Sequence, residues 1–224
     1  MALNVVTEVD GSVAIRHVLI SVSDKTGLDM LVRGLLQINP DIHLYSTGGT
    51  YAAIQALPGA ERNLIAVSDY TGQPEMQGGL VKTLDFKIYL GLLSETYNEA
   101  HQADLARTGA VALDMVVVNL YPFREAVARA DVTPEMARTN IDIGGPCMIR
   151  AAAKNYLRVA SVTDPSDYEG VLGAMAQGNG HLDLAMRLAL MKKAFAHTAA
   201  YDAAIGAYFG NVDAQAAGAC YRIQ

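Results

Sequence analysis

Short apolar runs alternate along the chain with longer segments in which apolar residues recur at helical spacing. The run 17–23, His-Val-Leu-Ile-Ser-Val-Ser, is typical of a buried parallel strand. After it, Leu28, Leu31 and Leu35 fall on one face of a predicted helix. Further strand-like runs cover residues 42–46, 64–68, 115–119 and 158–163, and helical patterns cover 50–57, 95–108, 147–154 and 165–176. The alternation predicts an α/β fold, a parallel-sheet α/β/α sandwich with helices on both faces.

One domain, residues 15–210, is predicted between two short terminal segments. Residues 1–14 form an N-terminal extension that is loose or pairs at a sheet edge. The range 182–210 carries Leu, Met, Phe and Ala at helical spacing, which predicts one or two C-terminal helices. Residues 211–224 are rich in Ala and Gly, and we expect a flexible tail or a short extension.

The composition narrows the class of protein. Of the 224 residues, 51% are hydrophobic, enough to bury a sizeable core. A net charge of −6 and a pI near 5.3 argue against a general nucleic-acid binder, which would carry a basic face. Cys147 and Cys220 provide no disulfide framework, which fits a reducing compartment. No apolar run approaches the ~18 residues of a membrane span and the first residues lack a signal-peptide pattern, so we expect a cytoplasmic protein with no membrane partner.

A short loop, Ser46-Thr47-Gly48-Gly49-Thr50, joins a strand-like run to a helical pattern. Backbone N–H groups at a helix start bind anions, the glycines allow close approach, and the hydroxyls add donors. A second segment, Lys82-Thr83, follows a Gly pair and supplies a cation. Ordinary surface turns are the alternative for both, and the loop has neither the dinucleotide fingerprint nor the Walker spacing. We interpret the two segments as one phosphate pocket.

Polar side chains follow several of the predicted strands. Ser23 and Lys25 come after the first strand, Asp69 after the third, and Asn119 and Tyr121 after the fourth. Ligands of parallel sheets bind beyond the carboxyl ends of the strands. These groups therefore predict a polar binding site at that edge, with plain turn chemistry as the alternative.

Asp142 and Lys154 flank a helical pattern whose first turn contains Pro146. The carboxylate could act only as a helix cap, or it could converge with Lys154 and transfer protons on a neutral substrate; the spacing leaves both open. His197 and Tyr201, four residues apart near the C-terminus, are interpreted as packing residues of a helix. The five histidines are scattered and the two cysteines lie far apart, so no metal is expected.

Eight motifs, in order, resemble those of one family. They are 21–27 (Ser-Val-Ser-Asp-Lys-Thr-Gly), 46–50, 67–72 (Val-Ser-Asp-Tyr-Thr-Gly), 74–76 (Pro-Glu-Met), 81–84 (Val-Lys-Thr-Leu), 119–123 (Asn-Leu-Tyr-Pro-Phe), 141–145 (Ile-Asp-Ile-Gly-Gly) and 150–155 (Arg-Ala-Ala-Ala-Lys-Asn). The chain resembles the IMP cyclohydrolase domain, the N-terminal, methylglyoxal-synthase-like half of the bifunctional purine biosynthesis protein. The resemblance covers about residues 17–210, including 193–202 near the C-terminus.

The resemblance implies dehydrative ring closure of 5-formamidoimidazole-4-carboxamide ribonucleotide to inosine monophosphate, without a metal or organic cofactor. The implied catalytic positions are Lys82, Asn119, Tyr121, Asp142 and Lys154. In this interpretation Lys82 stabilises the formyl oxygen, Asp142 and Lys154 transfer protons, and the other two orient the base. The implied substrate- and phosphate-binding positions are Ser23, Lys25, Ser46, Thr47, Gly48, Gly49, Thr50, Asp69, Thr83, Gly144 and Gly145.

The chain departs from the family pattern next to the Lys-Thr segment and in length. Leu80 stands where the family has Arg, and Asp85 and Tyr89 replace two His. These changes raise the alternative of a non-catalytic module that binds a purine nucleotide. A lyase or hydrolase acting on another small phosphate is a third interpretation, which the motifs at 119–123 and 150–155 disfavour. We expect a stand-alone homodimer that lacks the transformylase domain and receives its formylated substrate from a separate protein.

Overall fold

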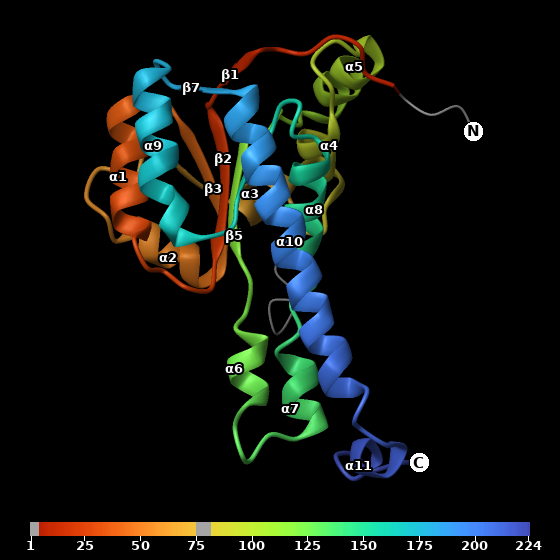
Figure 1. Ribbon diagram of the computed structural model, residues 1–224. Coiled ribbons are helices and arrows are strands. Elements are labelled where there is room, and N and C mark those ends of the chain that lie inside the picture. Colours follow the sequence, from red (N-terminus) through yellow and green to blue (C-terminus); the bar gives the residue numbers. More distant parts are fainter. Residues whose placement is uncertain (1–4, 75–81) are drawn as a thin grey trace.

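The computed structural model describes residues 5–74 and 82–224, and its centre is a five-stranded parallel sheet (Figure 1). From one edge to the other the strands are β4 (Leu64–Ala66), β3 (His43–Ser46), β2 (His17–Val22), β5 (Met115–Asn119) and β6 (Ala160–Val162). Every neighbouring pair in this sheet is parallel. Along the chain, β3 and β4 extend the sheet from β2 toward one edge. Strands β5 and β6 then extend it from β2 toward the other edge.

Helices cover both faces of the sheet, as the sequence predicts. One face carries α1 (Leu28–Ile38), α2 (Gly48–Gln55) and α9 (Tyr168–Gln177), the last preceded by a short 3₁₀ turn, η2 (Pro165–Asp167). The other carries α3 (Val67–Thr71), α4 (Phe86–Leu93), α8 (Gly144–Lys154) and α10 (Leu184–Phe209), while α5 (Glu99–Thr108) packs on α4.

Two apolar clusters form the core, one on each face of the sheet. Val18 and Ile20 point into the cluster beside α1 and α9, whereas Leu19 points into the cluster beside α8. This alternation is the period-two pattern of a strand that is buried on both sides. The α/β sandwich is therefore confirmed.

Two local predictions need correction. The third strand ends at Ala66 rather than residue 68, because Val67 begins helix α3. Helix α4 was not predicted, since its sequence, Phe-Lys-Ile-Tyr-Leu-Gly-Leu-Leu, is apolar nearly all round and offers no helical period. The carboxylate of Asp85 caps this helix by accepting a hydrogen bond from the Lys87 N–H at 2.8 Å.

A two-stranded antiparallel sheet joins the ends of the domain. Its strands are β1 (Ser12–Ala14) and β7 (His181–Asp183). The fully buried guanidinium of Arg187 lies beside them and donates hydrogen bonds to the carbonyl oxygens of Asp10, Tyr156, Leu157 and Leu182. One side chain thus fixes the N-terminal segment, the approach to β6 and the start of α10 together.

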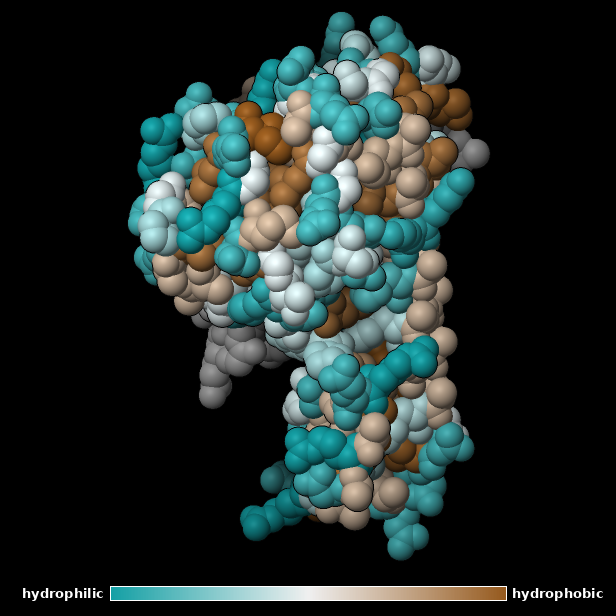
Figure 2. Space-filling view, turned by 60° about the vertical axis from the view of Figure 1, so that its left-hand side comes forward, coloured by the Kyte–Doolittle hydropathy of each residue, from teal (hydrophilic) through white to brown (hydrophobic). Residues whose placement is uncertain are grey.

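Helix α10 runs 26 residues and extends well beyond the sheet, where α6 (Phe123–Val127), α7 (Pro134–Thr139) and α11 (Ala214–Gly218) pack beside it (Figure 1). This protruding part is narrower than the body in the space-filling view (Figure 2). The C-terminal segment is part of it, because the Tyr221 hydroxyl contacts the Glu135 carboxylate on α7. In the described ranges, no helix has the length and apolar character needed to span a bilayer.

Candidate functional site

A cavity of about 350 Å³ opens at the carboxyl ends of β2, β3 and β5. The strand order reverses between β2 and β5: the strands that follow β2 lie on one side of it, and β5 and β6 lie on the other. Ligands of open parallel sheets bind at such a switch point. Most of the predicted site residues line the cavity: Ser23, Lys25, Thr47, Gly48, Gly49, Thr50, Lys82, Thr83, Asn119, Tyr121, Asp142, Gly144 and Gly145.

The positive end of the cavity lies at the N-terminus of α2. Gly48 has a φ of +54°, and a Cβ atom there would lie 2.8 Å from the Lys82 Nζ. A Cβ at Gly49 would lie 4.0 Å from the Lys25 Nζ. Two ammonium groups and the first N–H groups of a helix therefore meet at one point, which is the chemistry of a phosphate site.

Replacing Gly48 with Ala should raise KM for a phosphorylated ligand by about tenfold, since an L-residue in the left-handed region costs about 1–2 kcal/mol and the new methyl group displaces the Lys82 ammonium. Steady-state kinetics or calorimetry measures the change. Gly49→Ala is the matched control: its Cβ has room and should leave KM within about twofold. Equal effects of the two substitutions would contradict this description of the loop.

A second helix N-terminus, that of α8, lines the opposite part of the cavity wall. A Cβ at Gly144 would lie 2.5 Å from the Thr83 Oγ1, so the hydroxyl can approach the helix only because residue 144 is glycine. Gly145 is similarly restricted, because a Cβ there would lie 2.5 Å from the Asp142 Oδ2. The two glycines allow Thr83 and Asp142 to pack against the first turn of α8.

Asp142 is held at this turn by its own side chain. Its Oδ1 accepts a hydrogen bond from the Gly145 N–H at 2.9 Å. Burial raises the pKa of the Asp142 carboxyl, and the bond from Gly145 lowers that pKa by a smaller amount. The charged lining residues within the described ranges are Lys25, Lys82 and Asp142, so the cavity combines a positively charged end with a carboxylate that can accept a proton.

The side-chain amide of Asn119 is hydrogen-bonded to the loop that follows β2. Its Oδ1 accepts hydrogen bonds from the Ser23 and Asp24 N–H groups, at 2.6 and 2.9 Å, and its Nδ2 donates to the Asp24 carbonyl oxygen at 2.8 Å. The amide at the end of β5 therefore fixes the loop after β2, which carries Lys25. Asn119 lines the cavity but acts through this loop.

Two predicted phosphate-binding hydroxyls are engaged with the backbone. Ser46 is fully buried, does not line the cavity, and donates to the Ile20 carbonyl oxygen at 2.8 Å. Thr50 Oγ1 donates to the Val22 carbonyl oxygen at 2.9 Å and accepts from the Val22 N–H at 3.1 Å. Both hydroxyls fasten neighbouring elements to β2, and Thr47, Gly48 and Gly49 are the other predicted residues of this loop, all of which line the cavity.

Two further predicted residues lie away from the cavity. Asp69 is exposed on helix α3, because the residues expected at the end of the third strand are helical. Lys154 is exposed in the last turn of α8, and a rise of about 1.5 Å per residue places it about 15 Å from Gly144. Within one chain, Lys154 and Asp142 do not converge.

The residues that depart from the family pattern do not line the cavity where they are described. Asp85 is engaged as the cap of α4, and Tyr89 is partly buried on the same helix, where burial raises the pKa of its hydroxyl. Two further motif positions, Leu80 and Val81, lie outside the described ranges. The same holds for Glu75 and Met76 of the 74–76 motif. The effect of having Leu80 in place of the family's Arg thus stays a prediction.

Sequence reasoning missed several lining residues and one supporting residue. Thr139 at the end of α7 and Ile141 and Ile143 in the connection to α8 also line the cavity. Tyr201 does not line it, but its hydroxyl bonds to this connection. A tyrosine at helical spacing gives no sign of such a bond. In the part of the chain that the structure describes, no group of three or more His, Cys, Asp or Glu is placed to hold a metal ion.

Comparison with known proteins agrees with the α/β fold. Residues 27–147 match the model of the MGS-like domain, and residues 152–223 match that of the AICARFT/IMPCHase bienzyme. The chain belongs to the MGS-like domain family.

Individual relatives of the chain are named more specifically than the domain family. The bifunctional purine biosynthesis protein PurH of Synechococcus sp. (strain CC9605) is 48% identical over 188 residues, which are 84% of this chain and 35% of the relative. PurH of Parasynechococcus marenigrum (strain WH8102) is 50% identical over 189 residues, 84% of this chain and 36% of the relative. The chain is thus related to PurH and spans about a third of the length of these relatives.

A solved structure covers nearly the same length. The crystal structure of ForH superposes with a TM-score of 0.76 at 34% sequence identity, over 91% of this chain and 98% of ForH. The match extends through almost the whole of both chains.

Proposed function

We propose that this protein is an IMP cyclohydrolase that closes the ring of 5-formamidoimidazole-4-carboxamide ribonucleotide to give inosine monophosphate. The relationship to PurH supports this proposal, as does the observation that one cavity contains two lysines at a helix N-terminus and a carboxylate with a raised pKa. The 5′-phosphate would bind at Gly48, Gly49 and Lys25, which places the base toward Asp142.

In the proposed reaction, the carboxamide nitrogen attacks the formyl carbon of the same molecule. A C–N bond forms, and one proton passes from the carboxamide nitrogen to the formyl oxygen, which becomes a hydroxyl on the new ring carbon. That hydroxyl then leaves as water together with the proton of the former formamide nitrogen, as the C=N bond of the ring forms. Because both reacting groups belong to one substrate, holding them in the attacking geometry supplies much of the acceleration. No oxidant or second substrate is needed.

The residues divide this work by their chemistry. The Asp142 carboxylate can accept the proton from the carboxamide nitrogen, since burial makes it a stronger base than an exposed aspartate. The Lys82 ammonium lies beside Gly48, next to the proposed phosphate position, and would swing from there toward the base to stabilise negative charge on the formyl oxygen. Tyr121, half exposed at the cavity mouth, is available to contact the base.

The direct test follows the ultraviolet absorbance of inosine monophosphate after mixing purified protein with the formylated ribonucleotide. The wild type should turn over, and Lys82→Met should lower kcat/KM by about 10²-fold, the usual effect of losing one group that stabilises an oxyanion. Lys87→Met is the matched control, because Lys87 lies on the nearby helix α4 with its ammonium bonded to the Tyr70 carbonyl oxygen, away from the cavity. Tight binding of inosine monophosphate without turnover would support the non-catalytic module instead.

A further inference from the structure

The connection that carries Asp142 is held by a hydroxyl from a distant part of the chain. The Asp142 N–H donates to the Tyr201 Oη at 2.8 Å, and the Tyr201 hydroxyl donates to the Asn140 carbonyl oxygen at 3.3 Å. One hydroxyl thus bridges two backbone groups, on either side of residue 141. Asp142 lies between the end of α7 and the start of α8, outside any strand, so no sheet partner fixes its backbone.

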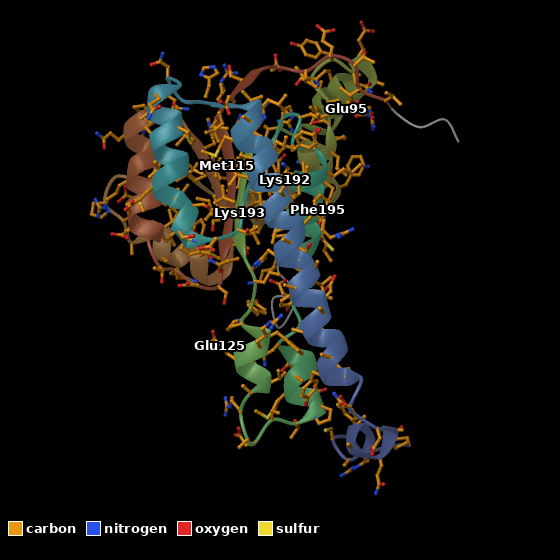
Figure 3. All side chains as sticks on the ribbon, in the orientation of Figure 1. Glu95, Met115, Glu125, Lys192, Lys193 and Phe195 are labelled. Atoms are coloured by element: carbon orange, nitrogen blue, oxygen red, sulfur yellow. The ribbon has the colours of Figure 1, made fainter. Side chains whose placement is uncertain are left out.

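Tyr201 is itself rigidly placed. Its side chain is only 8% exposed, and its ring meets the Phe123 ring edge-on, with centroids 6.2 Å apart. Helix α10 is fastened to the body about two turns before Tyr201. Lys193 pairs with Asp167, and Phe195 lies under the Arg150 guanidinium of α8; both labelled side chains are on the part of α10 beside the sheet (Figure 3). The hydroxyl therefore has a fixed position relative to α8.

Tyr201 has no direct access to a ligand. It does not line the cavity, and its hydroxyl is engaged with two backbone groups. Its influence on chemistry must therefore pass through the connection that it holds. Asp142 is restrained from two directions, by Tyr201 at its backbone N–H and by Gly145 at its side chain.

We propose that Tyr201 is a positioning residue for ring closure, whose hydroxyl holds the α7–α8 connection so that the Asp142 carboxylate faces the substrate in a partly desolvated setting. This proposal rests on the proposed cyclohydrolase function for its kinetic consequences. Its structural part, the restraint on Asp142, stands independently of any turnover.

Loss of the hydroxyl should change both geometry and ionisation. Without the bridge the connection loosens and water reaches the carboxylate, so its raised pKa falls toward the ordinary value. The ionisable groups that interact with Asp142 are Tyr89 on α4, which also contacts Cys147 of α8, and Tyr201 itself, which interacts with Asp202 and Tyr121 as well; Lys82 lies elsewhere in the cavity wall. Because the Tyr201 hydroxyl also interacts electrostatically with Asp202 and Tyr121, a shift is assigned to Asp142 from the resonance of its own carboxyl.

The test compares Tyr201→Phe with Tyr208→Phe. Tyr208 lies on the same helix and packs on the same Phe123 ring, and its hydroxyl makes no hydrogen bond among the described residues. For Tyr201→Phe we expect kcat to fall about tenfold or more, KM to stay within about threefold, and the acid limb of the pH–rate profile to move to lower pH. Tyr208→Phe should leave all three unchanged.

Two measurements without substrate separate this proposal from the proposed function. Carbon-13 NMR of labelled aspartate gives the pKa of the Asp142 carboxyl, and hydrogen exchange gives the protection of its amide. Both should drop in Tyr201→Phe only. If the wild type shows no turnover, the proposed function fails, while these two measurements still decide the positioning role.

An unchanged carboxyl pKa and unchanged amide protection in a folded Tyr201→Phe protein would overturn the proposal. A KM that rises as much as kcat falls would also overturn it, because it would indicate a general loss of the pocket. Should Tyr201→Phe fail to fold, Phe123→Leu is decisive: it displaces the Tyr201 ring without removing the hydroxyl, and it should shift the same quantities in the same direction.

Discussion

Asp142→Asn should lower kcat for ring closure by about 10³-fold, within the range for loss of a general acid or base, while KM changes little. The amide has the same shape as the carboxylate, and its oxygen can still accept the Gly145 N–H bond, so the connection keeps its structure. Only the ability to take a proton from the carboxamide nitrogen is removed. Inosine monophosphate formation under saturating substrate measures the effect.

The pH dependence provides an internal check on Asp142. The carboxylate is active when ionised, and burial raises its pKa above the ordinary 3.8. Activity should therefore fall as the pH falls through that raised pKa, and this limb should be absent from the residual activity of Asp142→Asn. Asp69→Asn changes an exposed carboxylate outside the cavity and should reproduce the wild-type profile. Retention of the limb in Asp142→Asn would assign it to another group.

Asp114→Ala should reduce the free energy of unfolding by about 3–5 kcal/mol, because it leaves the buried Arg158 guanidinium without its carboxylate. The Arg158 Nη1 and Asp114 Oδ1 atoms are 3.1 Å apart, and the two side chains are 8% and 10% exposed. The other oxygen of Asp114 accepts the N–H groups of Arg16 and His17, at 3.0 and 2.9 Å. The substitution thus removes a charge partner and two bonds that join β5 to the start of β2.

A surface ion pair with the same separation serves as the control. The Arg62 Nη2 and Asp41 Oδ1 atoms are also 3.1 Å apart, but their side chains are 70% and 91% exposed. Water and salt screen such a pair, so Asp41→Ala should cost less than about 1 kcal/mol. Urea unfolding of both variants compares a buried ion pair with an exposed ion pair of the same N–O separation. Similar losses for the two would show that the Asp114–Arg158 pair gains nothing from its buried setting.

The apolar pattern predicted the sheet because its strands are buried on both faces. A run such as Met115–Asn119 has every residue buried and cannot be read as amphipathic, so it was recognised as a central strand. The same logic failed for Phe86–Leu93, an apolar run that forms helix α4. Apolar runs of this length do not distinguish the two structures, and the Asp85 cap was the only local signal.

Site residues could be proposed from the sequence where the residue type itself indicates a role. They could not be where the role depends on which atoms the side chain contacts. Gly48 has a positive φ, and because it lacks a Cβ atom the Lys82 ammonium can lie beside it. Ser46 and Thr50 belong to the same loop, yet their hydroxyls bond to the backbone of β2. Which acceptor a hydroxyl finds depends on elements that are distant in sequence, and so does the bond between Tyr201 and Asp142.

The bond between the Tyr201 hydroxyl and the Asp142 backbone also bears on the order of events during synthesis. Its two residues are 59 positions apart, and Tyr201 is the later one to leave the ribosome. Because a domain is made from its N-terminus, the strands and all cavity-lining residues are translated before the helix that holds the α7–α8 connection. A nascent chain can thus carry the complete lining of the pocket and still lack the restraint on its carboxylate, so we expect ligand binding to precede full activity as the polypeptide grows.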